Sequence, residues 1–338
     1  MQGGCVVVDG TIKVIEAMAI ISTDIDAAAK LLSQDAVVAI PTETVYGLAG
    51  NGFSDAAVRK IFEAKNRPHF NPLILHISNQ EMLKDLVTAI PDEAQELMKS
   101  FWPGPLTVVL PKSKKVSSLV SGDLPTVAVR IPNHPTTIAL LNKIDFPLAA
   151  PSANMFGCIS PTTALHVENQ LGTKIPMILD GGDCNRGLES TIIGFENNQP
   201  VLYRLGAISF EEIERVLPNI LYSEVHTTKV LAPGMLPYHY SPNAKLFVSD
   251  DIQSEADNFK GKNVGVITFS NKLNGIVSAK MKVLSSTRNF EEASKNLYAA
   301  LHALDELKVD YIFAQKFPDY DLGRTINNRL YKASKKGE

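Results

Sequence analysis

Short apolar runs alternate with helix-like segments over the first 212 residues, and this pattern predicts a mixed α/β domain. The segment after Ser54 shows the helical pattern well, because Ser54 or Asp55 can cap it and Val58, Ile61 and Phe62 fall on one face. Strands are expected at 36–40, 73–77, 106–110, 126–131, 147–150, 177–179 and 190–195, and further helices at 81–87, 93–100, 136–141 and 161–171.

The alternation resumes in a shorter C-terminal region. Strands are expected at 245–248, 264–269, 281–284 and 311–314, with helices near 290–307 and 324–334. This order predicts a small, mostly parallel α/β sheet. Between the two regions, Pro233, Gly234, Pro237 and Pro242 argue against a helix or a central strand. We therefore expect a domain over 20–212, a proline-rich connection over 213–242 and a second domain over 243–338.

The composition fits a folded protein of about two domains. The chain has 338 residues, of which 45% are hydrophobic and 20% charged, and this balance excludes a disordered or collagenous chain. No uninterrupted apolar run is long enough for a membrane span, and no basic segment precedes an apolar one as in a signal peptide, so we expect a cytoplasmic protein. Three distant cysteines, Cys5, Cys158 and Cys184, argue against a disulfide framework and are expected to be reduced.

The common fingerprints for nucleotides and metals are missing. No GxxxxGK[ST] motif occurs, and the glycines at 47–52 have the wrong order for GxGxxG. The seven histidines form no HExxH or HxH pattern, so no protein metal site is predicted. Any nucleotide must therefore be held in another way.

Lys65 and Arg67 are candidate phosphate ligands at the end of the first predicted helix. Pro68 favours an extended conformation for the residue before it, and in an extended segment Lys65 and Arg67 point the same way. Arg67 would offer a bidentate fork and Lys65 a point charge. The alternative is that both cations only complement the helix dipole before a proline stop.

Arg130 is a candidate ligand for a carboxylate. The segment 126–131 alternates with period two, so Thr126 and Arg130 share one face of a strand. An arginine in a strand interior needs an anionic partner. That partner is either a substrate carboxylate or an ordinary Asp or Glu, and the sequence leaves both open.

Small polar residues follow an apolar strand at 151–154, where open α/β sheets bind ligands. The alternative is an ordinary turn. Ser160 and Pro161 fit the first positions of a helix, which would leave free N–H groups beside that turn.

Two further segments carry donors. The glycine-rich loop 180–191 can present N–H groups to an anion or act as a plain flexible connection. Thr42, Thr44 and Tyr46 place hydroxyls on one side of an extended run, which ordinary β-propensity also explains. Together the candidates are cations, hydroxyls and N–H donors without a nucleophile, a set that suits transfer at phosphorus.

In order and spacing, these segments resemble the YrdC/TsaC family of L-threonylcarbamoyl-AMP synthases. The resemblance extends from about residue 20 to the C-terminus, and the motifs in the connection are those of the long two-domain form. It implies a twisted YrdC-like α/β domain with a large concave face, followed by a smaller Rossmann-like domain. The motifs are Pro41-Thr-Glu-Thr-Val-Tyr-Gly, Lys65-Asn-Arg-Pro, Asn71-Pro-Leu-Ile-Leu-His, Pro103-Gly-Pro-Leu-Thr, Thr126-Val-Ala-Val-Arg, Ala149-Ala-Pro-Ser-Ala-Asn, Glu189-Ser-Thr-Ile, Ala232-Pro-Gly-Met and His239-Tyr-Ser-Pro.

The resemblance also implies an activity and a set of site residues. Family members convert L-threonine, bicarbonate or CO₂, and ATP into threonylcarbamoyl-AMP and pyrophosphate, with Mg²⁺ carried by the nucleotide. The product passes to a threonylcarbamoyl-transferase complex that forms N6-threonylcarbamoyladenosine in tRNA. By this resemblance the catalytic set around the phosphates is Lys65, Arg67, Ser152 and Asn154, the ATP site is completed by Asn71, Thr126, Ser160, Arg204 and Tyr238, and threonine is held by Thr42 or Thr44, His76, Arg130, the Ala150 backbone and Ser190.

Several features bear on alternatives. Leu236, Pro237 and Tyr238 stand where other family members often carry a basic and aromatic series, and residues 1–19 match no family motif. An RNA-binding module is disfavoured because residues 25–212 carry 15 basic against 19 acidic side chains. A carbamoyl-transfer maturation factor with a similar domain would need CxxC motifs, which are missing. The connection is expected to fold over the cleft as a lid, with a stiff tether as the alternative.

Overall fold

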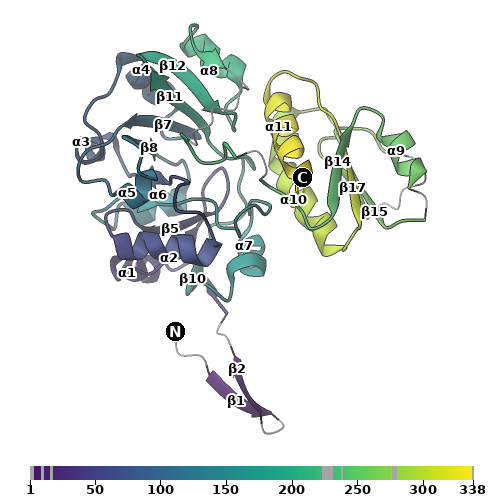
Figure 1. Cartoon of the computed structure of the whole chain (residues 1–338), viewed down its shortest axis with the longest axis horizontal. Helices are drawn as coiled ribbons and strands as arrows, with labels where there is room; N and C mark the ends of the chain where they lie inside the picture. The colour runs from purple at the N-terminus through teal and green to yellow at the C-terminus, as the bar shows by residue number, and fades with distance from the viewer. Residues whose placement is uncertain are drawn as a thin grey trace.

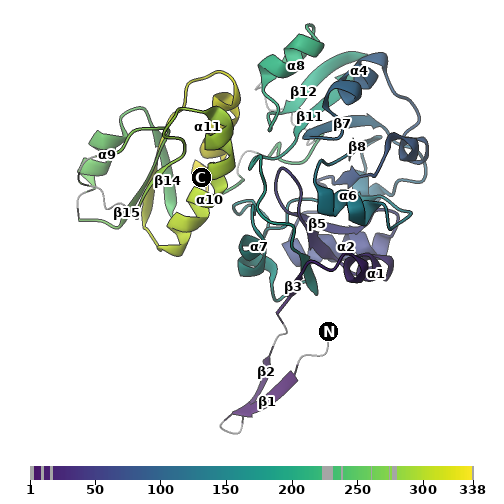
Figure 2. The same ribbon diagram turned by 180° about the vertical axis from the view of Figure 1, so that it is seen from behind.

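The computed structural model describes residues 4–8, 11–15, 18–222, 231–236, 239–259, 261–273, 275 and 280–336. A large first domain and a smaller C-terminal domain lie side by side (Figure 1). Strands β1 (Gly4–Val8) and β2 (Thr11–Ile15) form an antiparallel pair that extends away from the first domain (Figures 1 and 2). Among the described residues, none of the helices combines the length and apolar character that a membrane span requires.

The first domain is built on a mixed sheet. Within the described residues this sheet has 11 strands in the order β13-β12-β11-β7-β8-β6-β9-β5-β4-β10-β3. The bounds of the strands are β3 (Ile20–Ser22), β4 (Val38–Ile40), β5 (Gly47–Asn51), β6 (Ile74–His76), β7 (Leu106–Pro111), β8 (Thr126–Arg130), β9 (Leu148–Ala149), β10 (Met177–Leu179), β11 (Thr191–Glu196), β12 (Gln199–Arg204) and β13 (Leu221–Tyr222).

Helices of the first domain bury apolar faces against this sheet. In α2, Val58, Ile61 and Phe62 are buried, and the Ser54 side chain accepts a hydrogen bond from the Ala57 N–H, so the predicted face and cap are confirmed. The helices are α1 (Ile25–Ser33), α2 (Asp55–Lys65), a 3₁₀ turn (Gln80–Met82), α3 (Leu83–Leu86), α4 (Asp92–Phe101), α5 (Ser118–Ser121), α6 (Pro135–Leu141), α7 (Ala164–Leu171) and α8 (Phe210–Val216).

The C-terminal domain is a second, parallel sheet, and its main apolar cluster continues into residues of the first domain such as Ile159 and Leu188. Its four strands pair in the order β14-β17-β15-β16, and all three pairings are parallel, as expected from the sequence. Helices α10 and α11 lie between this sheet and the first domain (Figures 1 and 2). The elements are β14 (Lys245–Ser249), α9 (Ile252–Asn258), β15 (Val264–Thr268), β16 (Met281–Val283), α10 (Phe290–Glu306), β17 (Tyr311–Gln315) and α11 (Leu322–Ser334).

Three expectations about local structure are corrected. Helix α7 begins at Ala164 with Thr163 as its cap, because the Ser160 hydroxyl donates instead to the Glu189 carboxylate. Asn66 adopts a left-handed conformation with φ 54°, so the segment from Lys65 to Arg67 is not extended. The boundary expected at residue 212 falls inside α8, and β13 still pairs with β12 of the first sheet.

Candidate functional site

A cavity lies in the first domain where several loops meet the connection. Nine residues named from the sequence contribute to its wall. Pro233, Gly234, His239 and Tyr240 of the connection also line it. Tyr238 lies outside the described residues. The nine residues are Thr42, Thr44, Arg67, His76, Arg130, Ala150, Ser152, Ser190 and Arg204.

Arg130 occupies one end of the cavity and is held on three sides. Its Nη2 lies 2.6 Å from Glu43 Oε1, its Nη1 donates to Thr44 Oγ1 at 3.0 Å, and its Nε donates to the Gly104 carbonyl at 3.1 Å. In this structure the anionic partner of Arg130 is thus an ordinary glutamate. The guanidinium is buried and fixed in direction.

His76 and two threonines surround Arg130. His76 on β6 pairs in register with Arg130 on β8, and burial together with that cation lowers the pKa of His76 to about 3. The imidazole is therefore neutral. The hydroxyls of Thr42 and Thr44 lie 2.7 Å apart, and Thr42 Oγ1 donates to the Val45 carbonyl. This end of the cavity offers a cation and hydroxyls in fixed positions.

Arg67 lines the cavity and Lys65 adjoins it, and both bind backbone carbonyls. Lys65 Nζ donates to the carbonyls of Ser152 and Asn154, which ties α2 to the turn after β9. Arg67 donates to the carbonyls of Asn71 and Pro72. Burial lowers the pKa of both groups, and each is lowered further by a neighbouring cation. Among the described residues, neither cation has a carboxylate as its hydrogen-bond partner.

Arg204 links the end of β12 to the connection. Its Nε and Nη2 donate to the Ser190 carbonyl, and its Nη1 donates to the Pro233 carbonyl at 3.0 Å. Ser190 Oγ lies 2.7 Å from Thr107 Oγ1. The guanidinium therefore fixes both the loop before β11 and the segment that crosses the cavity.

The connection packs closely on the sheet beside the cavity. Ala232 and Met235 contact a small apolar cluster that includes Ile74 and Ala128. Gly234 has φ +82°, and a Cβ atom there would lie 3.0 Å from the Arg204 side chain. Glycine is therefore the residue that lets the chain pass this close to Arg204.

Some residues named from the sequence do not reach the cavity wall. Lys65 donates to the Asn154 carbonyl, and the Asn71 carbonyl accepts a hydrogen bond from Arg67. These three residues are not among those that line the cavity. Ser160 binds Glu189 at the contact with the second domain. Thr126 lies at the opposite end of β8 from Arg130, paired with Pro111, so the structure does not bring it to the site.

Two buried glutamates at the site had no role assigned from the sequence. Glu43 binds Arg130, and Glu189 lines the cavity and binds Arg329 of α11 with Oε2 2.8 Å from Nε. A signal for Glu43 was present, because it lies between the two candidate threonines. Glu189 had no comparable local signal, since its partner lies 140 positions away.

Buried positive charge around the cavity exceeds buried negative charge. Of the described residues that line or adjoin it, six cations and two carboxylates are buried. Burying unbalanced charge is unfavourable unless an anion compensates it. The described residues contain no group of three or more His, Cys, Asp or Glu that could hold a metal ion. The cations are Lys65, Arg67, Arg130, Arg204, Arg329 and Lys332, and the carboxylates are Glu43 and Glu189.

Together, a large mixed α/β domain with a cationic cavity, a connection that contributes to the cavity wall and a second, smaller parallel α/β domain define a two-domain class of protein. Comparison with known proteins gives the family. A family model described as "Telomere recombination" (Sua5_yciO_yrdC) matches residues 30–206, and one described as "Threonylcarbamoyl-AMP synthase, C-terminal domain" matches residues 208–335.

Relatives match along almost the whole chain. The chain is 43% identical over 318 residues to the threonylcarbamoyl-AMP synthase of Bacillus subtilis, covering 91% of this chain and 92% of that relative. It is 43% identical over 323 residues to the Pyrococcus abyssi protein of the same name, covering 91% and 93%. The crystal structure of P. abyssi Sua5 complexed with L-threonine superposes with a TM-score of 0.87 at 39% identity, covering 94% of this chain and 98% of that one. The chain belongs to the threonylcarbamoyl-AMP synthase family in its two-domain form.

Proposed function

We propose that this chain is a threonylcarbamoyl-AMP synthase that uses L-threonine, bicarbonate and ATP. The observation that carries the proposal is one cavity whose wall holds Arg130, which can bind a carboxylate, together with two further buried cations, Arg67 and Arg204. An excess of buried positive charge favours a polyanionic ligand such as the triphosphate of ATP. Relatives that bear this name, and the threonine-bound P. abyssi structure, support the same assignment.

The Arg130 end suits threonine. The Arg130 guanidinium binds the substrate carboxylate while Glu43 and the Gly104 carbonyl hold its direction. Hydroxyls of Thr42 or Thr44 and Ser190, with the Ala150 backbone, bind the remaining polar groups of the amino acid. His76 stays neutral and adds no charge beside the guanidinium.

The reaction then proceeds in two bond-forming steps. The deprotonated amino nitrogen of threonine attacks the carbon of CO₂ or bicarbonate, which forms the C–N bond of a carbamate; from bicarbonate, water leaves. A carbamate oxygen attacks the α-phosphorus, and the bond from that phosphorus to the bridging oxygen of the β-phosphate breaks. Pyrophosphate takes the electron pair and leaves. The mixed anhydride that remains is threonylcarbamoyl-AMP.

Positioning and charge neutralisation supply the catalysis at phosphorus. Arg67 and Arg204 line the cavity and would contact the phosphates, and Lys65 fixes the turn that carries Ser152 and Asn154. Mg²⁺ would arrive on the phosphates and offset their charge. The cationic donors around the cavity fit such a nucleotide-borne ion better than a protein-held one, because the two buried carboxylates are already paired with arginines.

The cover over the cavity protects unstable intermediates. A carbamate and a mixed anhydride both hydrolyse in water, so a site that makes them gains from excluding solvent. Pro233, Gly234, His239 and Tyr240 provide that cover in the described part of the connection. This position supports the interpretation of the connection as a lid rather than as a stiff tether.

The fate of the product follows from its chemistry. A mixed carbamic–phosphoric anhydride is activated for transfer to an amine, which agrees with the transferase acting on a tRNA adenosine that the family resemblance implies. The first domain carries more acidic than basic residues between 25 and 212, so we propose that this chain does not itself bind RNA strongly. We place the reaction in the cytoplasm.

Labelled bicarbonate provides the test of this function. The protein is incubated with ATP, Mg²⁺, threonine and ¹³C-bicarbonate, and the products are analysed by mass spectrometry. We expect threonylcarbamoyl-AMP that carries one ¹³C atom, formed together with pyrophosphate. AMP without a threonylcarbamoyl group under all conditions would contradict the proposal.

A further inference from the structure

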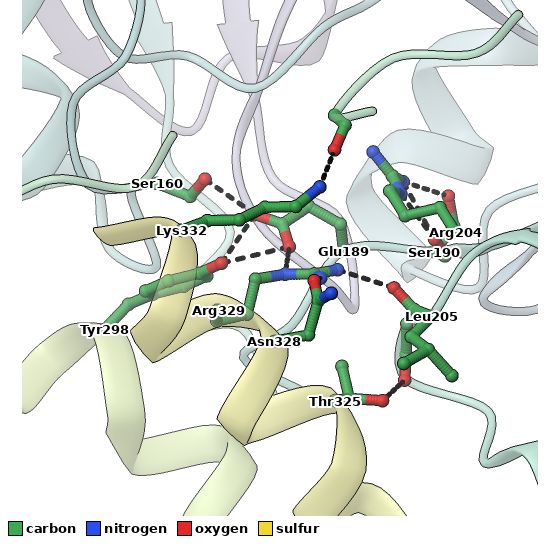
Figure 3. A network of polar contacts seen from close by, with 12 residues as sticks. Ser160, Glu189, Ser190, Arg204, Leu205, Tyr298, Thr325, Asn328, Arg329 and Lys332 are labelled. Carbon is green, nitrogen blue, oxygen red and sulfur yellow. Dashed lines mark hydrogen bonds and ion pairs between the residues drawn. The ribbon is translucent and has the colours of Figure 1, made fainter. Parts of the chain in front are cut away.

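Two cations of the second domain reach the wall of the cavity from one face of α11 (Figure 3). Arg329 and Lys332 lie one helical turn apart, and both are buried. Arg329 Nε donates to Glu189 Oε2 at 2.8 Å, and its Nη2 donates to the Leu205 carbonyl at 2.6 Å. Lys332 Nζ donates to the carbonyl of Gly234. Both acceptors Glu189 and Gly234 line the cavity.

The Glu189 carboxylate is shared between the two domains. Ser160 Oγ of the first domain donates to Oε1 at 2.7 Å, and Tyr298 OH of α10 lies 3.0 Å from both oxygens. Burial alone would raise the pKa of this carboxyl group, but Arg329 and Arg204 lower it to about 2. Glu189 is thus ionised, and its position depends on three donors that surround it.

The segment 231–236, hereafter the strap, is held from both domains. Arg204 of the first domain donates to the Pro233 carbonyl, and Lys332 of the second donates to the next carbonyl, that of Gly234. The His239 N–H also donates to the Lys332 carbonyl at 3.3 Å. Adjacent carbonyls of the strap therefore face cations from opposite domains.

We propose that Arg329 and Lys332 are positioning residues through which the second domain fixes the closed nucleotide cavity. Lys332 holds the strap over the cavity, and Arg329 holds Glu189 in its wall. The inference rests on the proposed function for the identity of the nucleotide. It assigns a role in that reaction to the C-terminal domain, although none of the described residues of its sheet lines the cavity.

The electrostatics of Lys332 agree with this role. Burial and the neighbouring cations Arg329 and Arg204 together lower the pKa of Lys332 to about 7, although Glu189 acts in the opposite direction. Filling an interface does not require a lysine, because an apolar residue of similar size fills the same space without the free-energy cost of removing an ammonium group from water. Phosphates in the cavity would raise the pKa of Lys332 and strengthen its hold on the strap.

The test compares Lys332→Met with Lys335→Met in the full chain. Lys335 is an exposed lysine at the end of the same helix and provides the matched control. We measure hydrogen–deuterium exchange of residues 231–236, the KM for ATP and for threonine, and kcat. Lys332→Met should speed exchange of the strap and raise the KM for ATP about tenfold, the effect of losing one charged hydrogen bond. The KM for threonine should change less, and Lys332→Arg should restore most of the loss.

A merely structural role would give a different result. It would lower kcat through a smaller active fraction and leave the KM for ATP unchanged. That result, or strap exchange equal to wild type in Lys332→Met, would overturn the proposal. If Lys332→Met does not fold, Arg329→Lys is the second test variant. It keeps the positive charge and loses the planar guanidinium group, so it should also raise the KM for ATP. If the proposed function is wrong, the wild type forms no threonylcarbamoyl-AMP. Hydrogen–deuterium exchange of residues 231–236 in Lys332→Met would still show whether Lys332 holds the strap, so the two failures are distinguishable.

Discussion

Arg130 Nη2 and Glu43 Oε1 lie 2.6 Å apart, with both side chains buried. The pair sits between β8 and the loop of Thr42 and Thr44, at the end of the cavity assigned to threonine. An incoming carboxylate must therefore share a guanidinium that already has an anionic partner. The arrangement fixes the direction of the guanidinium before the substrate arrives, which reduces the ordering needed on binding.

Arg130→Lys should impair the use of threonine more than the use of ATP. Lysine keeps the charge but cannot contact Glu43, Thr44 and a substrate carboxylate with a planar fork. We expect the KM for threonine to rise about tenfold or more, because charged hydrogen bonds are lost. An unchanged KM for threonine with a raised KM for ATP would reverse the assignment of this end of the cavity.

Glu43→Gln should destabilise the protein. Removing one partner of a buried ion pair leaves the other charge uncompensated, at a cost of about 3 kcal/mol. Unfolding by denaturant measures this change, and Glu63→Gln on the exposed surface of α2 is the control. Equal stability of the two variants would show that the Arg130 charge is compensated by another group.

Arg67→Ala should reduce turnover. Negative charge develops on the leaving pyrophosphate, and Arg67 is a buried cation in the cavity wall without a carboxylate among its hydrogen-bond partners. We expect kcat to fall by about a hundredfold, the typical loss for one such donor. Arg59→Ala, an exposed position on α2, should have no effect. If Arg67→Ala kept wild-type turnover, Arg67 would only complement the dipole at the C-terminal end of α2.

The contact between the domains should weaken in acid. The pKa of Glu189 is about 2 in the folded protein, below its ordinary value of 4.5, so the unfolded chain binds this proton first as the pH falls. Its stabilisation is full above pH 4.5 and is lost as the pH falls toward 2. The difference amounts to about 3 kcal/mol. Unfolding measured from pH 6 to 3 should show a steeper loss in the wild type than in Glu189→Gln. Identical slopes would contradict the ionised state of Glu189.

The sequence predicted those parts of the structure that local patterns determine. Apolar periodicity located α2 and most strands of the first sheet. Strand β5 was missed because its residues, such as Gly47, Ala49 and Gly50, lack the β-branched side chains that mark a strand. The start of α7 was misplaced because Thr163, rather than Ser160, provides its cap.

The candidate site was also predicted only in part from the sequence. Family motifs named nine residues of the cavity wall, but pairings across the fold were not predictable from local pattern. Glu189 meets Arg329 and Tyr298 only after the second domain docks, and the side chain of Ser160 turns toward that contact. Lys65 is the last residue of α2, before the left-handed Asn66, and it contacts the carbonyls of Ser152 and Asn154, a geometry that the proline after Arg67 did not reveal.

Pyrophosphate release from ATP provides the most direct test of the central claim. The wild-type chain is assayed with ATP and Mg²⁺, with threonine and bicarbonate present together or each omitted in turn. We predict that pyrophosphate accumulates only when both are present, because the attacking group is a carbamate formed from the two. Equal release of pyrophosphate with threonine omitted would contradict the account.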